Sequence, residues 1–299
     1  MLTTLLLSLI GAITLSTNNT TIVIDAPKGG EARIVYYGSK LSDREVGDLD
    51  VSGFKGNRAY PAFGLIGADE AAIAVTQSDG NKTLQLRIGD VESSSWEGGK
   101  IVRITSRDTF YPITVTNVYK SYDNQDIIET WAEITSSEKK KNEIILERYF
   151  SGALPIRYGD VYISTLYGTW ANEGRVNEEK LTRGTKLIKN ADGTRNSHTS
   201  HAEVMISLDG KARENDGRVI GAALEWGGNY ELRFVTNDTD YHTFFAGICP
   251  DNSEYHLAAG ETVTSIHAAV IDGSDAALYN TSGQRVTSGR GVMIQGGKK

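Results

Sequence analysis

Residues 167–201 concentrate the side-chain types that a binding site for a polar, ring-shaped ligand would use. Trp170 offers a flat aromatic face, and tryptophan is favoured where such a face stacks on the apolar side of a ligand ring. Glu173, Asn196 and His198 follow in the same stretch and can accept or donate hydrogen bonds. The segment therefore predicts a surface where an aromatic ring positions a ligand and polar groups bind its hydroxyls.

The same residues have a simpler explanation. Residues 167–201 lie between two sets of strand-like segments, and their polar side chains could do no more than hold this connection against the sheets. The sequence leaves both explanations open.

Motifs for catalysis, metals or cofactors are absent from the sequence. It has no His-Glu-x-x-His, no paired cysteines, no Gly-x-Ser-x-Gly and no glycine-rich phosphate loop after a strand. His198 and His201 lack a neighbouring cysteine or acidic cluster that would complete a metal shell. Carboxylates are plentiful, but no pair can be assigned as acid and nucleophile. We expect no metal, no cofactor and no autonomous catalysis.

Composition limits the partners. The net charge is −7 and no basic block stands out, which argues against nucleic acid and anionic membrane surfaces. Cys249 is the single cysteine, so no internal disulfide can form. A hydrophobic fraction of 39% allows a substantial core, and 32 glycines suggest short strands joined by tight turns.

Short alternating segments run through most of the chain. Residues 71–76 and 83–88 flank Asp79-Gly80-Asn81 and predict a hairpin, whereas residues 39–60 predict a long polar loop. Trp131 alternates within a strand and is expected in the core, and Trp96 is expected in a loop. The other strands are expected at residues 20–25, 32–37, 100–105, 113–119, 127–134, 143–150, 202–208, 218–224, 230–235, 241–248 and 262–271. Without a helical period, the pattern predicts an all-β fold with two large antiparallel sheets and a small C-terminal β tail.

The two ends differ from the middle. Residues 1–19 are apolar at first, too short to span a bilayer comfortably, and similar to the apolar part of a secretory signal, although no positive charges precede it. A buried first strand is the alternative. We predict export, no stable membrane span, and a sandwich over residues 20–272.

An ordered set of motifs resembles the N-terminal domain of glycoside hydrolase family 36, the α-galactosidases. No single piece is specific, but the set covers about residues 20 to 270. Its members are Tyr36-Tyr-Gly38, Tyr60-Pro-Ala-Phe-Gly64, Gly168-Thr-Trp170-Ala-Asn-Glu173, Leu181 with Gly184, Ser197-His198, Gly217-Arg-Val-Ile-Gly221, Gly228-Asn229, Gly247-Ile-Cys-Pro250 and Gly260-Glu261.

The resemblance implies a β-supersandwich that precedes a catalytic (β/α)₈ barrel. The family's nucleophile stands in a Lys-Trp-Asp context in that barrel; here no tryptophan follows a lysine, and no strand–helix alternation is present. The resemblance therefore implies a non-catalytic, substrate-proximal module in α-galactoside metabolism. Its partners would be α-galactoside sugars and a further copy or a separate barrel chain.

The family pattern also suggests which residues contact substrate. An acidic loop that in the family can reach a neighbouring subunit is shorter here, and Asp48 and Asp50 are its nearest equivalents. Thr199-Ser-His201 departs from the family's Asn-Pro. The expected substrate-binding residues are Trp170, Glu173, Asn196, His198, Asp48 and Asp50.

Residues 273–299 have their own resemblance, to C-terminal sorting tails of exported bacterial proteins. Leu278-Tyr-Asn and Gly291-Val-Met-Ile carry it. Supersandwich and tail together fit a natural barrel-less protein, an internal deletion or a misassembled gene. A stand-alone carbohydrate-binding or surface-assembly protein with no hydrolase role is the alternative function.

Overall fold

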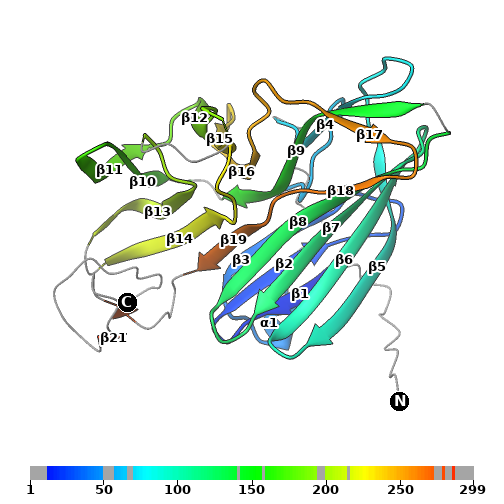
Figure 1. The fold of residues 1–299 in the computed structure, drawn as a ribbon. Helices are drawn as coiled ribbons and strands as arrows, with labels where there is room; N and C mark the ends of the chain where they lie inside the picture. The colour runs from blue at the N-terminus through cyan, green and yellow to red at the C-terminus, as the bar shows by residue number, and fades with distance from the viewer. Residues whose placement is uncertain are drawn as a thin grey trace.

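The chain folds almost entirely into antiparallel strands (Figure 1). The computed structural model describes residues 12–49, 57–65, 70–139, 142–156, 159–193, 199–213, 216–272, 278–279 and 285–286. The strands are β1 (Ala12–Ser16), β2 (Thr20–Asp25), β3 (Arg33–Ser39), β4 (Ile73–Thr76), β5 (Leu86–Trp96), β6 (Gly99–Asp108), β7 (Ile113–Tyr122), β8 (Ile127–Ser136), β9 (Glu143–Ile156), β10 (Tyr162–Thr169), β11 (Asn172–Lys180), β12 (Gly184–Asn190), β13 (Glu203–Arg213), β14 (Asp216–Leu224), β15 (Tyr230–Thr236), β16 (His242–Ile248), β17 (Tyr255–Ala258), β18 (Thr262–Thr264), β19 (Ala268–Asp272), β20 (Leu278–Tyr279) and β21 (Arg285–Val286). The predicted all-β class is confirmed.

A ten-stranded sheet forms the main layer. Its path runs β11-β10-β13-β14-β19-β8-β7-β6-β5, and β18 also pairs with β8. Strand β19 lies between the two halves: Ala268 is opposite Leu224 of β14 on one side and Thr130 of β8 on the other. The last strand of the sandwich therefore joins segments that are distant in the chain.

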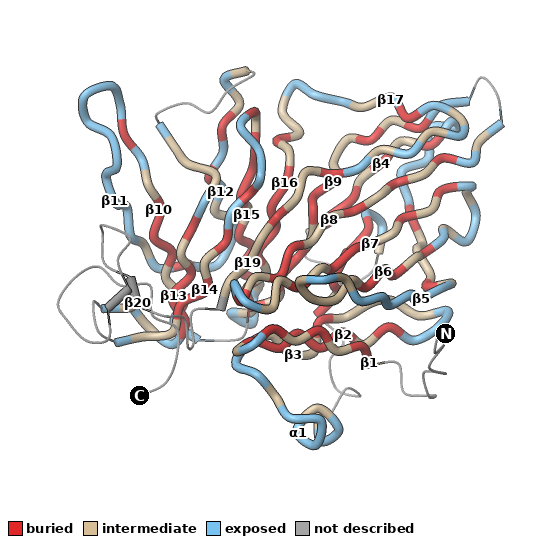
Figure 2. The backbone as a smooth tube through the Cα atoms, turned by 60° about the horizontal axis from the view of Figure 1, so that its bottom comes forward, coloured by how far each residue is buried: buried red, intermediate tan, exposed pale blue. Residues whose placement is uncertain are grey.

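Two smaller sheets cover one face of this layer. The three-stranded sheet β1-β2-β3 packs Leu15 and Ile24 into the same apolar cluster as Ile104 of β6. The six-stranded sheet, with the path β12-β15-β16-β9-β17 and β4 on β9, supplies Tyr230 and Phe234 to that cluster. The buried segments in Figure 2 follow these inner faces.

The opposite face of β5–β8 is turned toward the viewer in Figure 1, and no described element crosses it there. Successive side chains of a strand point to opposite faces of the sheet, so one set faces the core and the other faces this uncovered side, which we call the open face. In β7, Val115 and Tyr119 are buried toward the core, whereas Lys120 and Tyr122 lie on the open face and are half-buried.

The predicted hairpin between residues 71–76 and 83–88 is wrong. The turn exists, with Gly80 at φ 86° and the Gly80 N–H bonded to the Gln77 carbonyl. Strand β4, however, pairs with β9, and β5 begins only at Leu86 and pairs with β6. The Asp79-Gly80 sequence correctly predicts a turn at this point. The strand before the turn, β4, pairs with the fourteen-residue strand β9 and not with the strand that follows the turn.

Helix α1 (Asp43–Gly47) interrupts the expected loop over residues 39–60. Its start is a capping box: Ser42 accepts a hydrogen bond from the Glu45 N–H, and the Glu45 carboxylate accepts one from the Ser42 N–H. The Ser-Asp-Arg-Glu spacing is a helix-start signal that the sequence prediction missed. Residues 50–56 lie outside the described part of the chain.

The structure places part of the signal-like segment in the sandwich. Residues 12–16 form β1, which pairs with β2 over its whole length and buries Leu15. The buried-strand alternative describes these residues, and export stays a prediction. No helix in the described ranges has the length and apolar character needed to cross a bilayer. In the tail, β20 pairs with β21.

Candidate functional site

The segment expected to be a connector is instead a hairpin followed by a further strand. Strands β10 and β11 pair from Tyr162 opposite Lys180 to Thr169 opposite Asn172, which leaves Trp170 and Ala171 at the tip. Strand β12 then joins the other sheet through β15. The hairpin projects from the body of the molecule in Figures 1 and 2, and β11 is the edge of the ten-stranded sheet.

Local hydrogen bonds hold the tip. Ala171 adopts φ 60°, and its N–H donates to the Glu173 Oε1 at 3.0 Å. The Arg175 Nε donates to the Asn172 Oδ1 at 2.8 Å. Gly168 is required beneath the turn, because a Cβ there would lie 2.7 Å from the Asn172 carbonyl oxygen. The predicted residue Glu173 therefore has a structural role in shaping the turn.

Trp170 has no such explanation. Its side chain is 84% exposed, the largest value among the large apolar residues that the structure describes as exposed. Tyr167, Val176 and Leu187 are exposed in the same region. Exposed apolar groups gathered in one place indicate an interaction surface more often than isolated ones do.

A groove of about 420 Å³ lies at the base of the hairpin. It runs between β10 and β11 on one side and β12 with residues 199–200 on the other. The polar side chains along it include Asn177, Glu179, Lys186, Lys189 and Ser200, and the apolar ones include Leu187. These groups combine hydrogen-bond donors and acceptors with apolar surface, as small-molecule sites do.

Ion pairs and hydrogen bonds fix the groove walls. The Lys186 Nζ lies 2.7 Å from the Glu179 Oε1 and links β12 to β11. A hydrogen bond to Asp251 raises the pKa of Lys189 above its ordinary value, so this lysine is cationic at neutral pH. The Tyr230 hydroxyl donates to the Ser200 Oγ at 2.7 Å. The groove thus offers both charges in fixed places.

The structure brings together only part of the predicted set. Trp170 and Glu173 share the hairpin tip. Asp48 caps the exposed end of α1, which lies well apart from the hairpin in both Figure 1 and Figure 2. Asn196, His198 and Asp50 lie outside the described residues. The sequence prediction missed the groove residues, because Asn177, Lys186 and Ser200 meet only when β11 and β12 are placed on neighbouring sheet edges.

Two other predictions about tryptophans need correction. Trp131 is on the open face of β8 and not in the core. Its ring stacks on that of His267, with the two ring centroids 4.3 Å apart. Strict alternation gave the right period but could not say which face is covered. Trp96 is the last residue of β5 and is not in a loop; its ring centroid lies 5.2 Å from that of Tyr122, with the two rings at 75° to each other.

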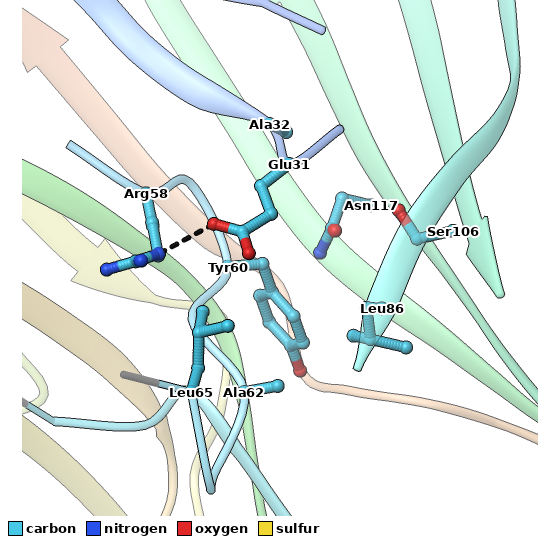
Figure 3. A pocket seen from close by; sticks show the side chains of 9 residues that line it. All are labelled: Glu31, Ala32, Arg58, Tyr60, Ala62, Leu65, Leu86, Ser106 and Asn117. Atoms are coloured by element: carbon cyan, nitrogen blue, oxygen red, sulfur yellow. Dashed lines mark hydrogen bonds and ion pairs between the residues drawn. The ribbon is translucent and has the colours of Figure 1, made fainter. Parts of the chain in front are cut away.

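The Tyr-Pro-Ala-Phe-Gly motif encloses a small cavity beneath Glu31 (Figure 3). The Glu31 carboxylate pairs with Arg58 at 2.7 Å and Arg87 at 2.8 Å; burial would raise its pKa, but the two arginines lower it overall. The Tyr60 hydroxyl donates to the Phe150 carbonyl. The cavity is about 20 Å³, which is room for about one water molecule, so these residues are structural.

A second hollow of about 450 Å³ opens beside the Tyr-Tyr-Gly motif. Tyr36 and Tyr37 of β3 line it, and Arg218 and Tyr241 lie across it. Its apolar lining and its separation from the hairpin make it a distinct surface. The three predicted substrate-binding residues that the structure describes, Asp48, Trp170 and Glu173, do not line it.

Comparison with known proteins assigns the family. The sequence profile described as "Glycosyl hydrolase family 36 N-terminal domain" matches residues 30–258. Among curated proteins, the probable alpha-galactosidase G of Aspergillus terreus is 25% identical over 165 residues, which are 55% of this chain and 22% of the relative. Alpha-galactosidase 2 of Pediococcus pentosaceus is 30% identical over 93 residues, 31% of this chain and 13% of the relative.

Solved structures agree on the fold. The α-galactosidase AgaB of Geobacillus stearothermophilus superposes with a TM-score of 0.79 and 18% identity, covering 88% of this chain and 40% of that enzyme. The Lactobacillus brevis α-galactosidase gives 0.77 and 19%, covering 87% and 39%. The chain thus spans about a fifth of the first curated relative and two fifths of these enzymes. It belongs to glycosyl hydrolase family 36 and corresponds to the N-terminal domain of that family's α-galactosidases.

Proposed function

We propose that the chain is a non-catalytic module in α-galactoside processing, and that the Trp170 hairpin contacts the sugar. The exposure of Trp170 on a turn that is held by local hydrogen bonds carries the proposal. A solvent-facing indole can stack on the apolar face of a galactosyl ring.

The groove supports the same proposal. Its volume of about 420 Å³ is within the range of small-molecule sites. Asn177 and Glu179 on β11 and Lys186 on β12 supply donors and acceptors for sugar hydroxyls at the base of the hairpin. An oligosaccharide held by Trp170 at one end could extend into this groove.

The class of sugar is proposed from the relatives. One solved neighbour is a variant of the α-galactosidase AgaA of Geobacillus stearothermophilus in complex with raffinose, and another is in complex with stachyose. Both chains are longer than the part that this chain matches. We therefore place the chemical step in a further segment or chain and the substrate contact here.

Calorimetric titration with melibiose and raffinose tests the binding. We expect saturable binding that weakens about tenfold in Trp170→Ala, because stacking on an aromatic ring contributes about 0.5–1.5 kcal/mol beyond the apolar area that it buries. Phe110→Ala is the matched control, since Phe110 is 76% exposed but lies between β6 and β7. Binding that survives Trp170→Ala, or its absence in the unaltered chain, would refute the sugar contact.

A turnover assay tests the non-catalytic part. Glu129 and Glu225 have carboxylate oxygens within 4.8 Å of each other, so they are the described acidic pair most worth examining. We expect no hydrolysis of an aryl α-galactoside above the blank. Hydrolysis that disappears in Glu225→Gln would show that this chain is an enzyme on its own.

The edge strand β11 favours a second candidate, a role in assembly. Eight of its nine residues are exposed, and Val176 within it and Tyr167 and Trp170 beside it add apolar surface. If the hairpin binds another protein chain or a further copy, light scattering should show an assembly that Trp170→Ala weakens while sugar has no effect. Competition between sugar and assembly would join the two functions.

A further inference from the structure

A histidine lies where the two halves of the ten-stranded sheet meet, and its ring contacts both a tryptophan and a carboxylate. His267 immediately precedes β19, the strand that joins β14 to β8. Its ring stacks on Trp131 with an interplanar angle of 5°, and its Nδ1 lies 2.5 Å from the Glu129 Oε1. Stacking on one face and a hydrogen bond at one edge leave the imidazole with a fixed orientation.

Two carboxylates converge on this ring. One ligand-type atom from each of Glu129, Glu225 and His267 lies within 4.8 Å of the other two. Glu129 is on β8, Glu225 follows β14, and His267 precedes β19, so the three come from separate parts of the chain. The Glu225 N–H donates to the His267 carbonyl at 2.9 Å. The sheet register therefore brings these residues together, rather than a local run of acidic residues.

The chemistry of the set matches a transition metal ion. Imidazole nitrogen and carboxylate oxygen bind Zn²⁺ tetrahedrally at about 2.0–2.2 Å, so two ligand atoms on one ion stand about 3.3–3.6 Å apart. The ligand-type atoms lie within 4.8 Å of one another, so movements of about an ångström, which the exposed Glu225 side chain can make, would bring them onto one ion. The hydrogen bond between the Glu129 Oε1 and the His267 Nδ1 would open as the ion takes its place. A nitrogen ligand favours zinc, cobalt or nickel over magnesium or calcium, which prefer oxygen alone.

We propose that Glu129, Glu225 and His267 form a binding site for a divalent transition metal ion on the open face of the ten-stranded sheet. Glu225 is exposed and His267 is half-buried, so an ion can enter from solvent, whereas Glu129 closes the inner side. The ion would tie β8, the end of β14 and the start of β19 together.

Neighbouring groups orient the ligands in the way that metal sites require. The Tyr122 hydroxyl donates to the Glu129 Oε2 at 2.6 Å, and the Lys120 Nζ lies 4.0 Å from the same oxygen. These contacts occupy one carboxylate oxygen and leave Oε1 facing His267. Outer groups that fix ligand orientation commonly raise metal affinity.

The carboxylates near His267 could instead serve to bind a protonated imidazole. His256 provides a comparison, because its surroundings have the arrangement that a protonated imidazole favours. The His256 Nδ1 lies 3.0 Å from Glu143 and its Nε2 lies 3.4 Å from Glu254. Carboxylates on opposite ring nitrogens suit a protonated imidazole, and they raise the pKa of His256. At His267 the carboxylates instead approach each other, which places two negative charges around one point.

The proposal is tested on the whole, tag-free chain. The chain is first treated with a chelator to remove bound metal and is then titrated with Zn²⁺ or Co²⁺. We expect one equivalent of Zn²⁺ to bind in calorimetry, with a rise in the thermal unfolding temperature, and Co²⁺ to give visible absorption bands. Glu225→Gln should weaken binding at least about tenfold, because it removes one ligand charge. Its side chain has no hydrogen-bond partner within the described ranges, so this variant should fold normally. His267→Gln should have the same effect.

His256→Gln is the control for adventitious binding at a surface histidine. It should leave the Zn²⁺ affinity within about twofold, since His256 is far from β19 in the sheet order. No saturable binding, binding that persists in both Glu225→Gln and His267→Gln, or binding lost in His256→Gln would each overturn the proposal.

Discussion

Arg233 shows how strongly a single charged residue can hold this sandwich together. Its guanidinium pairs with Glu231, whose side chain is 1% exposed, at 2.5 Å, and also with Glu70. Arg148 pairs with the other oxygen of Glu70 at 2.5 Å, and both arginines lie over the ring of Phe150. The network therefore connects β9, β15 and the approach to β4.

Removal of Arg233 should be strongly destabilising. In Arg233→Met, Glu231 stays buried without its cation, and breaking a buried pair in this way costs about 3–5 kcal/mol. Urea unfolding followed by tryptophan fluorescence measures the change. Arg107→Met is the control: Arg107 and Asp90 are both more than half exposed, so it should cost less than about 1 kcal/mol. Equal costs for the two variants would contradict this account of the network.

Glu70 should make the sandwich sensitive to acid. Burial would raise its pKa, but Arg148, Arg233 and the Ala71 N–H outweigh burial and lower the pKa overall. A lowered pKa in the folded state adds stability above the unfolded value of about 4.3 and loses it as the pH falls through the folded pKa.

Unfolding free energies measured between about pH 6 and pH 3 test this sign. The unaltered chain should lose stability as the pH falls below about 4.3, and Glu70→Gln should lose less over the same interval while being less stable at neutral pH. Identical slopes for the two proteins would show that Glu70 does not titrate as described.

Individual residues were predicted with mixed success. Trp170 stands out in the sequence because it follows Gly-Thr in a polar stretch, and the structure describes it as exposed. Glu129, Glu225 and His267 gave no signal, because strands that pair at long range place them together. Contacts of this kind depend on register and strand order, which the spacing of residues along one chain does not contain.

Strand β19 is the element on which the ten-stranded sheet depends. Val270 is opposite Ile128 of β8 and Ala222 of β14, so β19 has a hydrogen-bonded neighbour on each side. Proline has no N–H and is confined to edges and bulges of sheets. A proline in this strand would interrupt the connection between the two halves of the sheet.

We expect Val270→Pro to lower the unfolding free energy by about 3 kcal/mol or to prevent folding, through loss of one ladder hydrogen bond and a ring clash. Val270→Ala keeps the N–H and removes only two methyl-sized groups, at about 1–2 kcal/mol. Urea unfolding compares them. If the proline variant is no less stable than the alanine variant, β19 does not hold the halves together.

The elements themselves were largely predictable, but their partners were not. Period-two alternation located β7 and β8, whose pairing as consecutive strands follows from the short turn between them. Pairing of β4 with β9, or of β19 with both β8 and β14, brings together segments far apart in the chain. Exposed polar strands such as β11 also escaped prediction, because a strand without a buried face shows no alternation of apolar residues.

At the scale of the whole molecule, the sandwich separates two surfaces. The open face of the ten-stranded sheet carries Trp131 and the proposed metal ligands, and the hairpin β10–β11 carries Trp170 and one wall of the groove. Family membership follows from the profile match over residues 30–258. The central proposal is that the Trp170 side chain contacts the sugar.

Nuclear magnetic resonance of the indole N–H groups tests that proposal most directly. The chain has four tryptophans, so Trp170→Phe and Trp131→Phe assign the two signals that matter. On titration with melibiose, the Trp170 signal should shift in a saturable manner, the Trp131 signal should stay in place, and maltose should shift neither. A Trp170 signal unmoved by melibiose, or one that moves equally with maltose, would contradict a galactoside contact at the hairpin.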